Sequence, residues 1–165
     1  MAQDKRLEDG AGPAAWLAAP TLALAWLIPG AGFAAHKRLA RGAALFAAIH
    51  LTFALGVAMH GGLDWPAWSI HNPGFNIVNN LTFIIQMGAG LPALISLAAD
   101  LGWARGALDF MAGQPSNPLF DLSGFYLLVA GAMNYFVVCN TYDRLFARAA
   151  AAQEPAGEDK SRGQA

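Results

Sequence analysis

The chain has 165 residues, of which 56% are hydrophobic and 13% are charged. A soluble domain is typically about 45–50% apolar and about 25% charged, so this composition argues against an ordinary soluble domain and predicts an integral membrane protein. The net charge of -1 gives no basis for nucleic-acid binding, because such proteins carry basic patches.

Charge-free windows predict four transmembrane helices. A helix needs about 20 mostly apolar residues to cross a hydrocarbon core of about 30 Å. The predicted spans are residues 14–35, 42–63, 77–99 and 122–146. A polar tail (1–13) precedes them, and we expect the polar tail that follows (147–165) to be disordered. The fold class is therefore all-α, a membrane bundle with an interfacial segment between the third and fourth spans.

The turn between the first two spans is the feature around which we expect the chain to be organised. Pro29 cannot donate a hydrogen bond to Ala25, so the first helix either kinks there or stops in a corner that leads back. The alternative of a cleaved signal peptide is disfavoured by the basic residues that would follow the cut. The corner residues are Pro29, Gly30, Gly32, Lys37, Arg38, Arg41 and Gly42.

Four spans would place this basic corner at the end of the bundle opposite both tails. Cationic residues flanking spans favour the cytoplasmic side. Counting the corner alone, we expect a cytoplasmic turn and external tails.

Two segments carry a resemblance to known proteins. Pro29-Gly30-Ala31-Gly32, the basic patch and the Arg41-Gly42 pair resemble the helical hairpin of TM2-domain proteins. They are more similar to a family of small uncharacterised bacterial multi-span membrane proteins, whose last span resembles residues 129–134 followed by Tyr142-Asp143. The resemblance implies a hairpin fold in the bacterial inner (cytoplasmic) membrane and no established activity. Phe33, Ala35 and Lys37 depart from the family's hairpin pattern.

Polar side chains within the predicted spans are few. They are His50, Asn79, Asn80, Gln86, Asn134 and Asn140. Hydrogen bonds between helices explain the amides most simply. The alternative is a proton or ion path, because ionisable groups inside a membrane are costly and usually functional. The two interpretations differ in whether these groups pair off or face one water-filled path.

A second polar cluster lies near the expected interface. His60 and Asp64 are four residues apart, on one helical face, and His71 follows in the next connection. These three side chains would suit a metal, although water-facing groups explain them more simply. The single cysteine, Cys139, permits no intramolecular disulfide. Nucleophile motifs, phosphate-binding loops and paired haem ligands do not occur, so we predict no cofactor and do not expect an enzyme.

The sequence thus predicts a small multi-pass membrane protein that acts as a structural or accessory subunit. Its expected partners are the lipid bilayer and either further copies of itself or a larger membrane complex. The alternative is a small transporter or channel-like protein that uses His50 and the intramembrane amides. A membrane-bound enzyme centred on His60, Asp64 and His71 is the third and weakest hypothesis.

Overall fold

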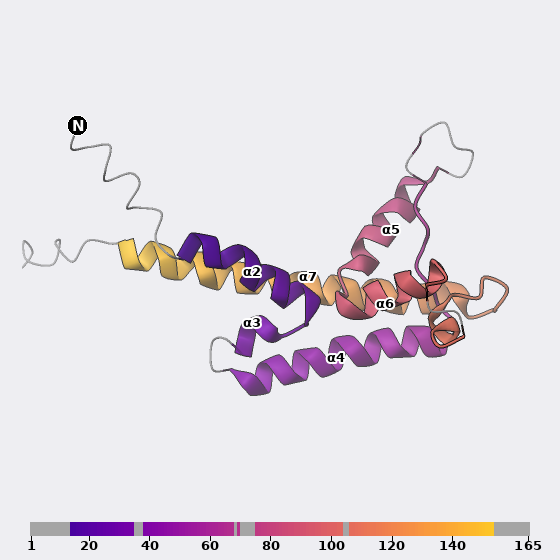
Figure 1. The fold of residues 1–165 in the computed structure, drawn as a ribbon, viewed down its shortest axis with the longest axis horizontal. Coiled ribbons are helices and arrows are strands. Elements are labelled where there is room, and N and C mark those ends of the chain that lie inside the picture. Colours follow the sequence, from indigo (N-terminus) through magenta and orange to yellow (C-terminus); the bar gives the residue numbers. More distant parts are fainter. Residues whose placement is uncertain (1–13, 35–37, 68, 70–74, 104–105, 154–165) are drawn as a thin grey trace, which may run out of the picture.

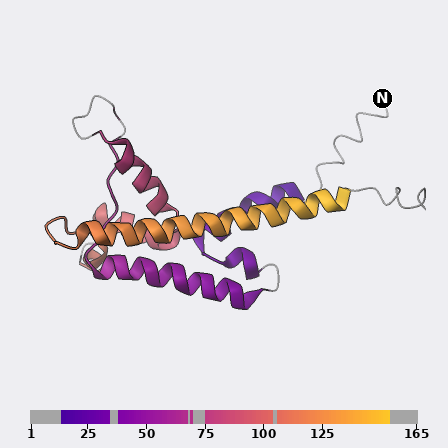
Figure 2. The same cartoon turned by 180° about the vertical axis from the view of Figure 1, so that it is seen from behind.

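The structure is a computed structural model that describes residues 14–34, 38–67, 69, 75–103 and 106–153. All regular secondary structure in these ranges is helical, as the sequence predicts. Helices α4 (Leu39–Ala58) and α7 (Phe120–Gln153) are continuous, and they run antiparallel along one another (Figures 1 and 2). The core lies mainly between them, where Ile49 and Leu127 are fully buried. These two helices form the frame of the molecule.

Helix α2 (Ala14–Leu27) ends at the predicted corner. Gly30 has a φ of 85°, a left-handed conformation that glycine adopts without steric cost. The short helix α3 (Ala31–Ala34) then leads to the start of α4, and Figure 1 shows α2 and α3 over the same half of α7. The described part of this predicted span, residues 14–34, therefore forms a shorter helix and a corner, which is the second of the two alternatives that the sequence left open.

The predicted third span is also divided. Helix α5 (Ile77–Met87) ends at Gly88, and α6 (Leu91–Asp100) begins after Gly90. Gly90 has a φ of 75°, so the chain changes direction at this break. Both helices lie toward the other half of α7, the half that begins at Phe120 (Figure 1). The two broken segments thus enter the bundle from opposite ends.

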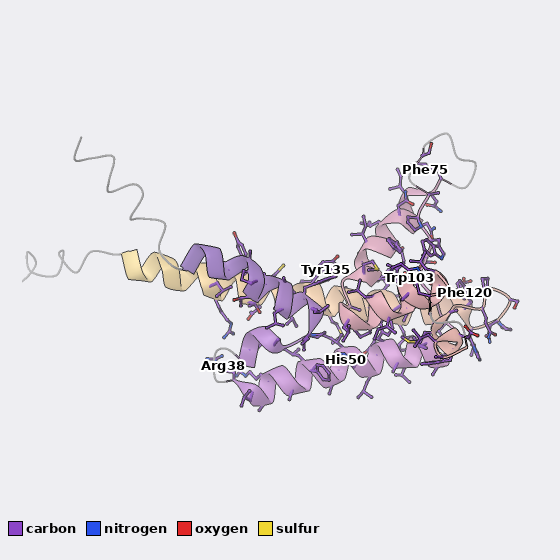
Figure 3. The ribbon with its side chains drawn as sticks, in the orientation of Figure 1. Arg38, His50, Phe75, Trp103, Phe120 and Tyr135 are labelled. Atoms are coloured by element: carbon purple, nitrogen blue, oxygen red, sulfur yellow. The ribbon has the colours of Figure 1, made fainter. Side chains whose placement is uncertain are left out.

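The expected position of the basic corner is wrong. Arg41 at the start of α4 and Arg144 near the end of the apolar part of α7 line one cavity, so they lie at the same end of the bundle. The reason is that the α5–α6 segment, which lies between α4 and α7 in the sequence, turns back at Gly90 instead of running the length of the bundle. Figure 3 shows Arg38 at this end and Phe120 at the other.

Two connecting regions differ in detail from the expected boundaries. Between α6 and α7 the described residues form turns and a short 3₁₀ helix, η1 (Asp109–Met111), which packs on α6. At the other end, α7 continues past residue 146 to Gln153. This extension is rich in alanine, the strongest helix former, so part of the tail that we expected to be disordered is helical. The remainder of that tail lies outside the described residues.

Two described helices are long and apolar enough to cross a membrane: Leu39–Ala58 and the Phe120–Leu145 part of α7. Only 28% and 33% of their most apolar windows are buried within the molecule. Large apolar side chains such as Leu51, Phe125 and Phe136 are 65%, 60% and 77% exposed. Soluble monomers rarely expose apolar patches larger than a few hundred Å². The exposed apolar surface therefore supports a membrane protein.

Candidate functional site

The two helix breaks meet at Asn134, in the middle of α7. Its side-chain amide Nδ2 donates one hydrogen bond to the Trp26 carbonyl oxygen and another to the Gly88 carbonyl oxygen, both at 2.8 Å. Asn134 is fully buried. We call this site, made of Trp26, Met87, Gly88, Gly90 and Asn134, the Asn134 junction. One side chain thus connects three segments that are far apart in the sequence.

The carbonyl groups at the junction need outside donors because the helices end there. The residue four positions after Gly88 is Pro92, which has no N–H to donate to the Gly88 carbonyl oxygen. Similarly, α2 ends at Leu27, before Gly30 can donate to the Trp26 carbonyl oxygen. An unsatisfied carbonyl group inside a membrane costs several kcal/mol. Asn134 supplies the two missing donors.

Further contacts close the junction. The Trp26 indole Nε1 donates to the Met87 carbonyl oxygen at 3.2 Å, which links the end of α2 directly to the end of α5. A Cβ atom at Gly90 would collide with the Trp26 carbonyl oxygen, so only glycine fits there. The Tyr135 hydroxyl donates to the Ile84 carbonyl oxygen at 2.8 Å, and Figure 3 shows Tyr135 beside α7 near the middle of the bundle. The backbone of α5 is therefore held from both α2 and α7.

The side-chain oxygen of Asn134 makes no contact of this kind with the residues that the structure describes. Because Nδ2 faces two carbonyl groups, the amide orientation is fixed by its partners. The Oδ1 atom is buried, and within the described residues no donor reaches it. The junction therefore carries one buried acceptor without a protein partner.

A second polar arrangement pairs Asp64 with Gln86. The Asp64 backbone N–H donates to Gln86 Oε1, and Gln86 Nε2 donates to the carboxylate oxygen Oδ2 of Asp64, both at 2.9 Å. A cavity of about 220 Å³ lies beside this pair, with Thr82 and Asp121 in its wall. Burial raises the pKa of Asp64; the hydrogen bond from Gln86 opposes this shift, and the negative charge of Asp121 adds to it. Gln86 therefore anchors the connection after α4 to α5.

Asn79 and Asn80 anchor the same connection further along. Asn80 makes two hydrogen bonds to the backbone of Ala67, accepting from its N–H at 2.8 Å and donating to its carbonyl oxygen at 2.9 Å. Asn79 Nδ2 donates to the Trp65 carbonyl oxygen at 2.6 Å. These amides provide hydrogen-bond partners for backbone N–H and C=O groups in a connection that is not helical.

His50 and Asn140 make local contacts. The His50 ring lies 3.8 Å from the ring of Phe46, and its Nδ1 lies 2.8 Å from the Phe46 carbonyl oxygen, one turn back on the same helix. Asn140 is exposed, and its Oδ1 accepts a hydrogen bond from Arg144 Nε at 2.7 Å. The predicted intramembrane polar residues are therefore divided among separate contacts, and the structure does not bring them together.

The predicted metal cluster is not assembled by the described residues. His60 is exposed and has a φ of 63° at the end of α4, while Asp64 is engaged by Gln86. His71 lies outside the described residues. Within the part of the chain that the structure describes, no group of three His, Cys, Asp or Glu side chains is placed to hold a metal ion.

The predicted corner residues lie against α4 and α7. A Cβ atom at Gly30 would meet the backbone of Gly42, and one at Gly32 would meet the side chain of Thr141. Pro29 is buried and Arg38 is exposed. Lys37 lies outside the described residues. The two glycines thus permit the close approach that the sequence predicts.

A sequence profile of a family of unknown function (DUF6677) matches residues 20–153. The chain belongs to this family. The matched range includes both helix breaks and Asn134, so the junction is part of the DUF6677 region. No curated protein and no solved structure gives a significant match.

Sequence reasoning did not identify the roles of several residues in the Asn134 junction and beside it. Trp26 and Tyr135 act here as hydrogen-bond donors, a role that hydropathy does not reveal. Gly131 lets α7 approach the Ile85 carbonyl oxygen of α5, where a Cβ atom would collide. One signal was present in the sequence, because Pro92 removes the helical donor to Gly88 and so requires a substitute donor from elsewhere.

Proposed function

We propose that this DUF6677 protein is a structural or accessory subunit of the bacterial cytoplasmic membrane, which packs against itself or a larger membrane complex. In this proposal α4 and α7 cross the bilayer. The α2–α3 and α5–α6 segments enter from opposite sides and meet near its middle. Broken helices are tolerated in a membrane where protein groups satisfy the freed backbone, and Asn134, Trp26 and Tyr135 do so here.

The observation that carries this proposal is the way the polar side chains are used. Asn134, Gln86, Asn80 and Tyr135 each hydrogen-bond to backbone of another segment. His50 bonds within its own helix, away from these amides. A conduction path would gather such groups along one passage, whereas a scaffold uses them as separate ties.

Charge distribution supports an orientation. Arg38, Arg41 and Arg144 lie at one end of the bundle, with Asp143 as the acidic residue near them. Asp64, Asp100, Asp109 and Asp121 lie toward the other end. Basic residues that flank spans favour the cytoplasmic side. We therefore propose that the basic corner and the end of α7 both face the cytoplasm.

One observation favours the alternative of a small transporter. Two discontinuous helices that meet inside a bundle are the usual setting of substrate and ion sites in secondary transporters. The unpartnered Asn134 Oδ1 lies at such a meeting point. In this alternative the functional residue is Asn134, and His50 takes no part.

Complementation of a deletion strain tests the proposal, with membrane accumulation measured in parallel. We expect His50→Leu to accumulate and complement normally, because His50 has no partner on another helix among its described contacts. We expect Asn134→Leu to lose accumulation and complementation together. An Asn134→Leu protein that accumulates normally but fails to complement would contradict the scaffold and favour the transporter. A His50→Leu protein with that behaviour would also contradict the scaffold, and it would favour the transporter hypothesis in which His50 is the functional residue.

Blue-native electrophoresis in mild detergent tests the subunit part of the proposal. We expect the wild-type chain to migrate as an oligomer or within a larger complex. Migration as a monomer, with no co-purifying protein, would contradict it.

A further inference from the structure

A cavity at the basic end of the bundle has the properties of a lipid headgroup site. Its volume is about 390 Å³, and its wall is formed by Phe33, Arg41, Ala44, Leu45, Asn140 and Arg144. Pockets for small molecules typically have volumes of about 300–1,000 Å³. The wall combines two guanidinium groups with an apolar surface from α3 and α4. It therefore suits a ligand that is anionic at one end and apolar at the other.

The position of Arg144 is fixed by two contacts. Its Nε donates to Asn140 Oδ1 at 2.7 Å, and the carbon atom of its guanidinium group lies 5.1 Å from the centroid of the buried Phe33 ring. Such a cation–π contact holds the guanidinium group over the ring and leaves its remaining N–H groups for another acceptor. Among the described residues, Arg144 has no carboxylate partner. Its charge is therefore available to an anionic ligand.

Arg41 adds a second positive charge in an unfavourable position. It lies in the first turn of α4, which contains no acidic residue and has no side-chain cap. The N-terminus of a helix carries a partial positive charge, so a cation there is destabilising and an anion is stabilising. The described part of the chain places no carboxylate partner beside Arg41 either. A bound anion would interact favourably with both arginines and with the helix end.

The location of the cavity distinguishes a lipid from a soluble anion. It lies where the apolar window of α4 begins and that of α7 ends, which is the headgroup level in the proposed arrangement. Leu51, seven residues after Ala44 on the same face of α4, continues the apolar surface and is 65% exposed. Basic pockets between membrane helices on the cytoplasmic side bind anionic headgroups. A free phosphate would leave the apolar part of the wall uncovered.

We propose that this cavity binds the phosphodiester group of an anionic phospholipid, between Arg41 and Arg144, with the acyl chains along α4. This inference rests on the proposed membrane location. It assigns an anionic phospholipid to a surface that would otherwise contact bilayer lipids without selectivity.

Native mass spectrometry of the full chain in mild detergent tests the site, with phosphatidylglycerol and phosphatidylcholine of identical acyl chains as probes. We expect phosphatidylglycerol to bind more tightly. One basic side chain at the headgroup level contributes enough that Arg41→Gln and Arg144→Gln should each weaken phosphatidylglycerol binding about fivefold. Arg38→Gln is the matched control, because it removes the same charge at the same end from a residue that does not line the cavity. It should weaken binding by less than about twofold.

Arg144→Lys separates charge from orientation. Lysine keeps the positive charge but cannot hold a planar group over Phe33, so binding should fall between those of the wild type and Arg144→Gln. Thermal unfolding of each variant shows whether the fold is retained. Equal binding of Arg144→Lys and the wild type would overturn the role of the Phe33 stack.

Three results would overturn the lipid site itself. The first is equal affinity for the two lipids, and the second is an equal loss in Arg38→Gln and in the cavity variants. The third is displacement of phosphatidylglycerol by inorganic phosphate at equal concentration, which would indicate a soluble-anion site. Release of the wild-type chain from membranes by alkaline carbonate would instead refute the membrane location, so the two failures are distinguishable.

Discussion

The continuous helices α4 and α7 differ from the broken segments α2–α3 and α5–α6 in how their backbone is satisfied. A continuous helix satisfies its interior N–H and C=O groups by its own hydrogen bonds. A broken helix leaves carbonyl groups at each end without internal partners. The side-chain hydrogen bonds between segments accordingly gather at the broken ones. Asn134 and Tyr135 project from α7 but donate to α2 and α5.

This difference explains where polar residues occur in an otherwise apolar chain. The described part of α4 contributes only local bonds, from Thr52 to the Ala48 carbonyl oxygen and between His50 and Phe46. The α5 segment alone carries Asn79, Asn80 and Gln86, and each of them binds another part of the chain. The polar groups therefore mark the places where regular helix is interrupted, and substitutions of the residues that make these contacts should cost more than substitutions elsewhere on the frame.

The largest expected effect is at the point where the two breaks touch. Gly90 and Gly106 both have positive φ values, 75° and 88°, but only Gly90 is crowded. A Cβ atom at Gly90 would collide with the Trp26 carbonyl oxygen, whereas Gly106 has open space. An alanine at position 90 would pay both for the positive φ and for the collision. Gly90→Ala should therefore lower the free energy of unfolding by about 3 kcal/mol or more.

Gly106→Ala is the control, because it has the conformational cost without the collision. It should cost about 1 kcal/mol. Thermal unfolding in detergent, followed by circular dichroism, measures both. Equal losses in the two variants would mean that the contact between the breaks contributes nothing to stability.

Asn134→Leu should have the second-largest effect. It leaves the carbonyl groups of Trp26 and Gly88 without their donor, and each hydrogen bond in a membrane protein contributes about 0.6 kcal/mol on average. Including the penalty for two buried unpaired acceptors, we expect a loss of about 2 kcal/mol. Asn140→Leu, which removes an exposed bond on the same helix, should cost less than about 0.5 kcal/mol. Chemical denaturation of the two variants measures both losses of unfolding free energy. A smaller loss in Asn134→Leu than in Asn140→Leu would mean that the hydrogen bonds at the helix breaks are not the more important ones.

Part of this architecture was predictable from sequence. The helical class followed from composition, and the interruptions followed from Pro29-Gly30 and from Gly88, Gly90 and Pro92. Proline lacks the N–H that a helix requires, and glycine readily leaves the helical conformation. The amides were interpreted as ties between helices, but Asn140 bonds within α7, and Asn79 and Asn80 bond to the connection after α4. These inferences depend on local chemistry, which the sequence states directly.

The direction of the chain after each break was not predictable. A hydropathy window counts apolar residues, and a segment that enters and returns has the same count as one that crosses. The partners of Asn134 lie 108 and 46 residues away, so no local pattern identifies them. The same limit applies to Arg41 and Arg144, whose shared cavity depends on the antiparallel packing of α4 and α7.

The smallest effect that sharpens the comparison concerns Asp64, in the connection that α5 anchors. Burial raises the pKa of Asp64 above its ordinary value of 3.8, and burial also raises the pKa of Asp100. A raised pKa means that the folded state binds more protons than the unfolded state between the two values. The contribution of these groups to stability is therefore largest at low pH and falls as the pH rises from 3.8 through the raised pKa.

Thermal unfolding at several pH values should show this fall in stability with rising pH. Asp64→Asn should make the slope of stability against pH smaller. Asparagine keeps an acceptor for Gln86 Nε2 but has no charge to desolvate, so Asp64→Asn should be at least as stable as the wild type at pH 7. Asp121→Asn removes only the neighbouring negative charge, so it should change the slope in the same direction by a smaller amount. An Asp64→Asn protein that is less stable than the wild type at pH 7 would mean that the charged carboxylate, and not the Gln86 hydrogen bond, holds this connection against α5.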